Sequence, residues 1–255
     1  MSRLTTDGLT LAMGERLFCR TFSHAFAAGE VWGVLGPNGS GKTTLLHTLA
    51  GLRPPQGGRV LLDGAPLDSM PVRSRARQLG ILLQESATTF PAPVRDCVLL
   101  GRHPHLGPWQ WETPADWQRV ERALAAVELA ELATQDQNSL SGGERQRLKL
   151  ATLMVQEPSI WLLDEPTNHL DLHHQIALVG LLCERVRAQQ QLLIMSLHDL
   201  NLAARFCDHL VLLYGDGRVE AGDAATMLQP ARLSALYRHP IRVVNDGVRR
   251  LWVAD

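Results

Sequence analysis

The chain has 255 residues, of which 45% are hydrophobic, enough for a sizeable core in one large domain or in two joined parts. Its 25 lysines and arginines nearly balance its 26 acidic residues, which argues against a nucleic-acid binder that relies on a broad basic field. Only 5% of the residues are aromatic, so we expect no platform for stacking on bases and no nucleic-acid partner.

Residues 1–7 lack the apolar stretch of a signal peptide, and no apolar run approaches the roughly 18 residues that cross a bilayer. We therefore expect a soluble, cytoplasmic protein, held by a partner if it works at a membrane. The cysteines form no C-x-x-C pair, which favours buried or idle thiols in a reducing compartment; they are Cys19, Cys97, Cys183 and Cys207.

The first predicted elements surround a glycine-rich loop. Residues 8–28 alternate apolar and polar side chains in part and predict two short strands of an antiparallel region. Residues 31–35 predict a buried strand, and residues 45–50 predict a helix that ends at Gly51. Between them lies the pattern G-x-x-x-x-G-K-[ST], in the strand, loop and helix context that it requires. Its residues are Gly36, Pro37, Asn38, Gly39, Ser40, Gly41, Lys42, Thr43 and Thr44.

This P-loop pattern has the chemistry of a phosphate-binding site. Glycines let backbone N–H groups approach an anion closely, and a helix N-terminus adds roughly half a positive charge. Lys42 can reach the β- and γ-phosphates, and Thr43 offers a hydroxyl to Mg²⁺. The alternative, a chance glycine loop, is disfavoured by the complete pattern in its context. The chain is therefore predicted to bind a nucleoside triphosphate.

Strands give way to helices after this loop. Residues 60–62 and 79–83 predict two strands, and the second ends at Gln84. The basic run of Arg73, Arg75 and Arg77 between them is interpreted as a solvated helix face.

A mostly helical insertion is predicted for residues 88–157. Thr113 and Pro114 are typical of a helix start. Apolar residues follow at helical spacing and predict a core stripe; they are Trp117, Val120, Leu124 and Val127. No strand pattern returns before Ile160.

Three later apolar runs predict strands at residues 160–163, 192–197 and 210–214. Helices are predicted between them, from about residue 170 to 188 and up to about residue 207. Strands that alternate with helices indicate a parallel sheet with helices on its faces, and such sheets bind ligands at the carboxyl ends of their strands. Polar residues gather there beside the P-loop: Gln84, Asp164, Glu165 and His198.

Asp164 and Glu165 close the strand at residues 160–163. Asp164 has the Walker B position, at which an aspartate helps to hold Mg²⁺. Glu165 is placed to polarise a water against the γ-phosphate, and a positioned general base contributes about 10²–10⁴-fold in rate. The alternative is that Glu165 only caps the turn at Pro166.

Another glycine-rich helix start lies at residues 140–144. Ser141 and Glu144 have the spacing of a capping box, and Gly142 and Gly143 leave the backbone N–H groups bare. Such a helix end is a candidate second anion site. Taken alone, it is equally a well-capped helix.

Residues 139–147, Ser-Leu-Ser-Gly-Gly-Glu-Arg-Gln-Arg, resemble the signature motif of ATP-binding cassette (ABC) ATPases. The family's other motifs follow its order over nearly the whole chain: Gln84 resembles the Q-loop glutamine, Asp164 and Glu165 the Walker B pair, residues 168–171 the D-loop, and His198 the switch histidine. The resemblance implies an α/β fold: a RecA-like P-loop NTPase core with a mainly parallel sheet, an N-terminal antiparallel β region and an inserted α-helical subdomain. Residues 1–255 would form a single ABC ATPase domain, with the core at 1–87 and 158–255 and the helical subdomain at 88–157.

The resemblance also implies that two copies dimerise head to tail, with ATP between the P-loop of one and the signature helix of the other. Ser141 and Gly143 would touch the γ-phosphate in trans, and Gly142 and Asp171 are further candidate nucleotide contacts. Gln84 would sense Mg²⁺ and the attacking water. His198 would hold the γ-phosphate and orient Glu165; its alternative is a core histidine with its polar atoms satisfied.

One position departs from the family pattern. The family usually stacks an aromatic residue on adenine, and the matching position here is Met13, with Phe18 as the alternative. Adenine stacking and base selectivity therefore remain open.

Residues 98–105 and 196–204 resemble ATPase subunits of iron-siderophore, haem and cobalamin importers. This implies a polytopic permease contacted near Gln84 and the helical subdomain, an indirect link to a periplasmic binding protein, and a peripheral place on the cytoplasmic face of the inner membrane. His103 and His105 could suggest a metal site, but two histidines without carboxylate or thiol company are weak evidence. The rival function is a non-transport ABC ATPase that acts as a regulatory or nucleic-acid-associated switch.

Overall fold

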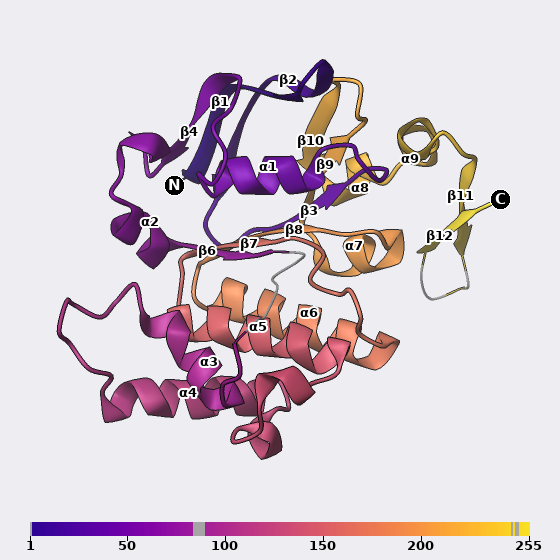
Figure 1. Cartoon of the computed structure of the whole chain (residues 1–255). Helices are drawn as coiled ribbons and strands as arrows, with labels where there is room; N and C mark the ends of the chain where they lie inside the picture. The colour runs from indigo at the N-terminus through magenta and orange to yellow at the C-terminus, as the bar shows by residue number, and fades with distance from the viewer. Residues whose placement is uncertain (1, 84–89, 246, 248–249) are drawn as a thin grey trace.

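The computed structural model describes residues 2–83, 90–245, 247 and 250–255. A β-rich part and a helical part lie on either side of a central sheet, and the two chain ends lie on opposite sides of the molecule (Figure 1). No helix in the described part of the chain has the length and apolar character needed to cross a bilayer.

The central sheet has six strands in the order β10-β9-β3-β8-β7-β6. All neighbours run parallel except β10, which is antiparallel to β9. The bounds of β3, β6, β7, β8, β9 and β10 are Val31–Leu35, Leu79–Leu82, Ile160–Leu163, Leu192–Ser196, His209–Leu213 and Val219–Asp223. β3, β7 and β8 are buried along their whole length, which explains their unbroken apolar sequence. The predicted, mainly parallel sheet is confirmed.

An antiparallel sheet in the order β2-β1-β4-β5 stacks above the central sheet, with α1 (Lys42–Leu49) between them (Figure 1). Its strands β1, β2, β4 and β5 span Ser2–Met13, Arg16–Ala27, Gly57–Leu62 and Ala65–Pro66. The expectation of two short strands within residues 8–28 was wrong in extent, because β1 begins at Ser2. Register shifts between Thr6 and Leu11 interrupt the apolar–polar alternation of β1. For this reason the sequence pattern did not reveal the first half of the strand.

Apolar side chains of α1 join the two sheets. Leu45, Leu46 and Leu49 are buried in one cluster with Leu4 and Phe26 of the antiparallel sheet, and the same cluster includes central-sheet residues such as Leu162 and Ile194. The helix that follows the P-loop is therefore packed between the two sheets. This packing fixes the position of the P-loop, which lies at the N-terminus of the helix.

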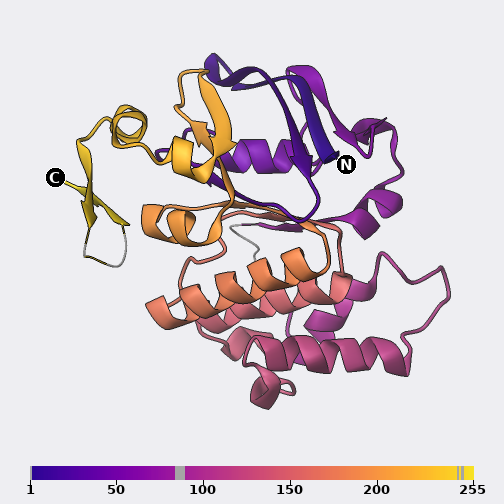
Figure 2. The ribbon, with the colours of Figure 1, turned by 180° about the vertical axis from the view of Figure 1, so that it is seen from behind.

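Helices cover the other face of the central sheet (Figures 1 and 2). They are α3 (Val94–Leu99), α4 (Pro114–Ala126), α5 (Gly142–Gln156), α6 (Leu172–Ala188) and α7 (Leu200–Phe206), with 3₁₀ turns η2 (Leu100–Arg102), η3 (Ala130–Leu132) and η4 (Gln137–Ser139). Val120, Leu124 and Val127 are buried, as the helical spacing predicted, and Trp117 is partly buried against the same core. The boundaries of a separate helical subdomain at residues 88–157 stay a prediction.

The described end of the chain adds elements that the sequence pattern did not suggest: α8 (Ala224–Met227), α9 (Pro230–Tyr237) and a hairpin of β11 (Ile241–Asn245) and β12 (Arg250–Ala254). The backbone N–H of Trp252 donates to Asn201 Oδ1 at 2.9 Å, and its indole donates to Leu228 O at 2.7 Å. These bonds fasten the hairpin to α7 and to the C-terminal end of α8.

Elsewhere, η1 (Leu67–Ser69) precedes α2 (Val72–Gln78), which exposes Arg73 and Arg77 as expected but leaves Arg75 half-buried. The four cysteines are buried and unpaired.

Candidate nucleotide-binding and hydrolysis site

The loop after β3 curves around the side chain of Lys42. Lys42 Nζ donates to Gly36 O at 2.9 Å and to Pro37 O at 3.3 Å. A Cβ at Gly36 would lie 2.4 Å from Leu213 O, and one at Gly41 would lie 2.7 Å from Phe18 Cβ. Gly41 also has a φ of 103°, in the range that favours glycine. The loop can therefore take this tight path only with glycine at both positions.

Lys42 and Ser40 are polar groups that this loop buries. Burial lowers the pKa of Lys42, while the nearby carboxylates of Glu165 and Asp164 act in the opposite direction. Ser40 Oγ is buried and has no hydrogen-bond partner among the described residues. Thr43 and Thr44 follow on the first turn of α1, both half-buried. A phosphate group has the charge and the acceptor oxygens to satisfy this cluster.

Asp164 directly follows β7, and its side chain is completely buried. Its Oδ1 accepts a hydrogen bond from Ser196 Oγ at 2.7 Å, whereas its Oδ2 has no hydrogen-bond partner in the described part of the chain. A buried carboxylate oxygen without a donor is costly, and a hard divalent cation is a ligand that would satisfy it. The carboxylate of Asp164 therefore fits the predicted magnesium site.

Glu165 is the next residue, and its carboxylate is held between two side chains. His198 Nε2 lies 2.5 Å from Glu165 Oε1, and Asn168 Nδ2 donates to Oε2. The backbone N–H of Glu165 donates to Ser196 Oγ at 2.8 Å. The backbone at Glu165 adopts a left-handed conformation with a φ of 49°. The structure thus brings together Glu165 and His198 from two strand ends, as the sequence predicted.

The signature segment begins α5 with the predicted capping box. Ser141 Oγ accepts from the Glu144 N–H, and Glu144 Oε2 accepts from the Ser141 N–H at 2.8 Å. Gly142 and Gly143 lie against His169: a Cβ at Gly143 would be 3.0 Å from His169 O. The cap is confirmed, and a nucleotide contact in trans stays a prediction.

The D-loop segment joins the signature helix to the hydrolysis site. Asp171 caps α6 by accepting from the His174 N–H at 2.9 Å. From the second turn of α5, the buried side chain of Gln146 donates to Pro166 O at 3.2 Å and to Glu165 O at 3.4 Å. α5 is therefore in direct contact with the turn that carries the acidic pair.

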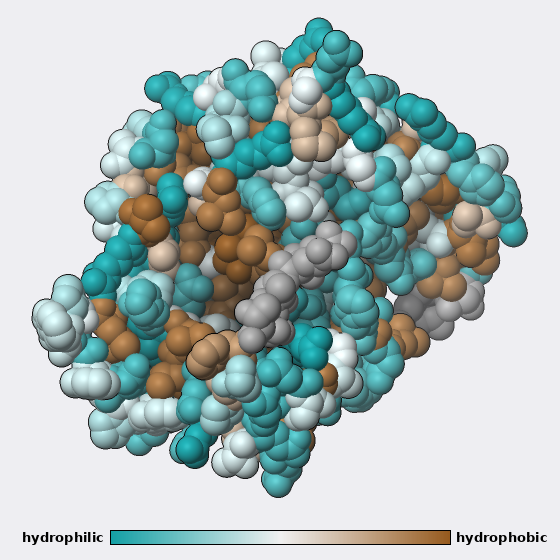
Figure 3. Space-filling view, in the orientation of Figure 1, coloured by the Kyte–Doolittle hydropathy of each residue, from teal (hydrophilic) through white to brown (hydrophobic). Residues whose placement is uncertain are grey.

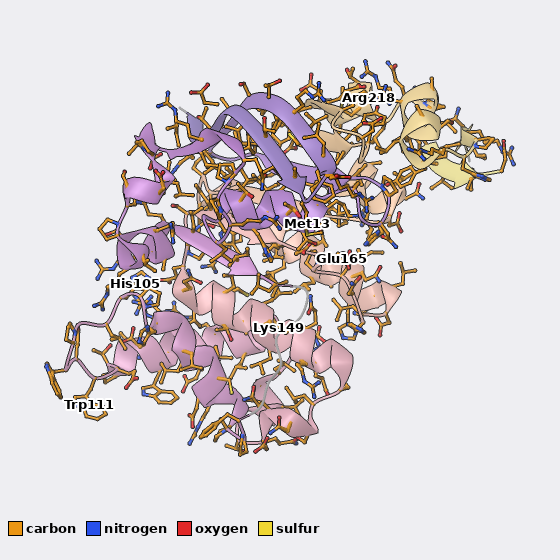
Figure 4. All side chains as sticks on the ribbon, turned by 45° about the horizontal axis from the view of Figure 1, so that its top comes forward. Met13, His105, Trp111, Lys149, Glu165 and Arg218 are labelled. Carbon is orange, nitrogen blue, oxygen red and sulfur yellow. The ribbon has the colours of Figure 1, made fainter. Side chains whose placement is uncertain are left out.

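The alternatives for the adenine contact differ in exposure. Phe18 is 3% exposed and packs under Gly41, so its ring is part of the core. Met13 is 58% exposed at the end of β1, and Figure 4 labels it together with Glu165. Arg16, across the turn from Met13, has its guanidinium 3.3 Å from a Cβ built at Gly39. The end of β1 therefore lies beside the P-loop with Met13 as its accessible apolar side chain.

The sequence assigned no role to Ser196 or Gln146, although both fall in segments that resemble the family, and it placed Asn168 only within the D-loop. Gln84, predicted as a magnesium ligand and catalytic residue, lies outside the described residues. Of the two histidines considered for a metal site, His105 has its Nε2 2.8 Å from Gln156 O.

Comparison with known proteins gives consistent matches. A family model described as ABC transporter matches residues 19–168. The chain is 36% identical to the ferric enterobactin transport ATP-binding protein of Escherichia coli (strain K12), over 97% of this chain and 92% of that protein. It is 41% identical to the hemin import ATP-binding protein of Pseudomonas entomophila (strain L48), over 92% of each. A solved structure of an inward-facing ABC transporter, described as of the metal-chelate type, has a TM-score of 0.86 and 26% identity, over 100% of this chain and 98% of that chain.

Proposed function

Because this chain belongs to the ABC transporter family, we propose that it is the ATP-hydrolysing subunit of an importer for a metal chelate, such as cobalamin, a ferric siderophore or haem. The observation that carries the proposal is the meeting of Lys42, Asp164, Glu165 and His198 at one edge of the central sheet. The substrate class is supported by relatives that are named for ferric enterobactin and hemin.

The site residues divide the work of hydrolysis. Lys42 exchanges its bonds to the loop carbonyls for bonds to the β- and γ-phosphates. Glu165 accepts a proton from the water that attacks the γ-phosphate, and its contacts with Asn168 and His198 fix it in advance. His198 holds this carboxylate and, by family resemblance, would contact the γ-phosphate.

Thr43 and Asp164 are the described residues that would hold Mg²⁺. Asp164 offers its unpartnered Oδ2, and Thr43 offers its hydroxyl from the first turn of α1. Gln84 joins them by family resemblance. When bound, Mg²⁺ neutralises charge on the β- and γ-phosphates.

A second copy of the chain completes the site. Ser141 is exposed at the N-terminus of α5. Gly142 and Gly143 have no side chains that would cover their own backbone N–H groups. In a head-to-tail dimer these groups bind the γ-phosphate held by the partner's P-loop. Closure of the dimer then depends on the γ-phosphate, and hydrolysis of ATP allows the two copies to separate again.

A groove between β6 and the helices α3 and α5 is the place for the permease. It has a volume of about 360 Å³ and includes the apolar side chains of Ile81, Leu83, Leu100, Leu148 and Leu153. Figure 3 shows a hollow with hydrophobic walls in the middle of this face. A cytoplasmic segment of a polytopic permease that fills the groove would place the chain on the cytoplasmic face of the inner membrane, and a periplasmic binding protein would act on it through the permease.

Replacing Glu165 with glutamine tests the hydrolysis assignment. Glu165→Gln keeps the size of the side chain but removes its basicity, so we expect ATP hydrolysis to fall by about 10²–10⁴-fold while ATP binding persists. Glu131→Gln on η3 is the matched control and should leave the rate unchanged. A Glu165→Gln variant that hydrolyses ATP at the wild-type rate would refute the assignment.

Recovery of the chain from membranes with Mg-ATP tests the import assignment. A co-purifying polytopic permease is the expected result, and its binding protein can then be screened with cobalamin, haem and ferric siderophores. Recovery with soluble partners alone would overturn import but leave the ATPase standing. Tight, strongly salt-dependent binding to nucleic acid would favour a non-transport switch.

A further inference from the structure

Two tryptophans extend from one loop of the helical part. Residues 106–112, here called the tryptophan loop, lie between η2 and α4 and contain Trp109, which is 99% exposed, and Trp111, which is 84% exposed. Trp32 and Trp161, by contrast, are buried. In Figure 4, Trp111 lies at the outer edge of the molecule and points away from its body. Paired exposed indoles present an apolar surface that proteins usually bury.

The turn at the tip of the loop holds Trp109 in a conformation that usually belongs to glycine. Gln110 N donates to Gly107 O at 3.1 Å, and Gly107 N donates to Gln110 Oε1 at 2.8 Å. Pro108 is the second residue of this turn, and Trp109 is the third with a φ of 67°. Glycine or asparagine is favoured there, because a bulky residue at positive φ is strained. Exposure and strain both oppose tryptophan here, and residues held in such conformations cluster at functional sites.

The base of the loop is fastened to three helices. Pro104 O accepts hydrogen bonds from Arg73 Nε at 3.0 Å and Arg77 Nε at 2.9 Å, both on α2. His105 contacts the last residue of α5, and Thr113 forms a capping box with Asp116 at the start of α4. The two indoles are therefore displayed on an ordered support.

The surroundings of the loop match the boundary between lipid and water. Arg73 and Arg77 are exposed cations at its base, and basic residues near an anionic membrane surface are attracted to it. Indole rings favour this boundary because the ring meets acyl chains while the N–H reaches polar headgroups. Leu100, which is 68% exposed on η2, lines the groove assigned to the permease. Leu100 lies six residues before the tryptophan loop, so the loop follows directly on this groove in the chain.

We propose that the tryptophan loop places Trp109 and Trp111 in the headgroup region of the bilayer and that Arg73 and Arg77 bind anionic lipid phosphates beside them. Lipid is the occupant because the loop exposes two indole rings, Arg73 and Arg77 of α2 supply cations at its base, and Glu112 is the one acidic residue within it. The chain would make this contact with lipid by itself. It requires neither a permease nor hydrolysis, and it goes beyond the proposed transport function.

Sedimentation of the full chain with sucrose-loaded vesicles tests the proposal. Vesicles of phosphatidylcholine with a quarter phosphatidylglycerol should bind the wild-type chain. The Trp109→Ala/Trp111→Ala variant should bind them with an affinity lower by roughly tenfold or more. Arg73→Gln/Arg77→Gln should lower binding to these vesicles to the level seen with phosphatidylcholine alone. Lipids brominated near the headgroup should quench the wild-type tryptophan fluorescence more than that of the double tryptophan variant.

Leu52→Ala/Val253→Ala removes two other exposed apolar side chains and is the matched control, with binding expected to stay at the wild-type level. Every variant should hydrolyse ATP at the wild-type rate, which verifies folding independently of lipid. Equal sedimentation of the wild type and the double tryptophan variant would overturn the proposal. So would binding confined to vesicles that contain the permease, because the loop's partner would then be protein. Neither result would affect the assignment of ATP hydrolysis or import.

Discussion

Ser196 contacts both acidic residues of the site, Asp164 through its side chain and Glu165 through its backbone. Its hydroxyl donates to Asp164 Oδ1 at 2.7 Å and accepts from the Glu165 N–H at 2.8 Å. One buried hydroxyl thus fixes the carboxylate assigned to Mg²⁺ and the backbone of the assigned base. A serine at the end of an apolar strand has no sequence signature, and only the pairing of β8 with β7 brings it beside the acidic pair.

We expect Ser196→Ala to lower ATP hydrolysis by about 10–100-fold and to raise the Mg²⁺ concentration for half-maximal rate, because Asp164 loses the group that orients it. The free energy of unfolding should also fall by about 1–3 kcal/mol, since two buried polar groups lose a partner. Magnesium titrations of the rate separate the two effects. Ser69→Ala, on η1, should change neither, and an unaltered magnesium requirement in Ser196→Ala would contradict the positioning role.

Met13 should limit how firmly the site holds a base. We expect Met13→Tyr to tighten ATP and GTP by similar factors, because stacking on an aromatic ring contributes about 1–3 kcal/mol for any base. Equilibrium binding of both nucleotides measures the change, with Glu15→Tyr in the adjoining turn as the control. Unchanged affinity in Met13→Tyr would mean that the base lies elsewhere.

At the scale of elements, the start of α5 serves stability and binding together. Ser141 and Glu144 close a capping box at the same residues that are proposed to contact the partner's nucleotide. The backbone N–H of Ser141, which donates to Glu144, holds the pKa of that carboxyl below its usual range. The cap therefore keeps the helix end in place without covering the glycine N–H groups.

Because the pKa of Glu144 is lower in the folded chain, its carboxylate adds stability that is fully present above the ordinary glutamate pKa. That contribution is lost as the pH falls through the lowered value. We expect Glu144→Ala to reduce the free energy of unfolding by about 1 kcal/mol or less at neutral pH. The difference from wild type should vanish in acid. Urea unfolding over a pH series tests this against Glu131→Ala, and a difference that grows in acid would contradict the sign.

At the scale of the molecule, the elements that the sequence predicted best are those that are fully buried. The strands at residues 160–163 and 192–196 are buried on both faces, so their apolar runs were unmistakable, and the polar residues after them were placed at one sheet edge correctly. The hairpin of β11 and β12 was missed because its side chains are mostly exposed and show no clear period. Exposure could not be inferred for Met13 and Phe18, since both lie in strands and only packing against Gly41 distinguishes them.

In the proposed dimer, Gln146 would link the partner's nucleotide to the hydrolysis site of its own chain. It lies one turn from the glycines assigned to the partner's γ-phosphate, yet its amide holds the backbone of Glu165 in its own chain. In a head-to-tail pair, occupancy of either site thus bears on the base of its twin, and the rate should rise with ATP more steeply than a hyperbola. We expect a Hill coefficient above about 1 for the wild type and close to about 1 for Gln146→Leu, with Gln118→Leu on α4 unaltered. Two copies joined in this way hydrolyse as a cooperative unit, so a single inactive copy should silence more than half of the activity in a mixed pair.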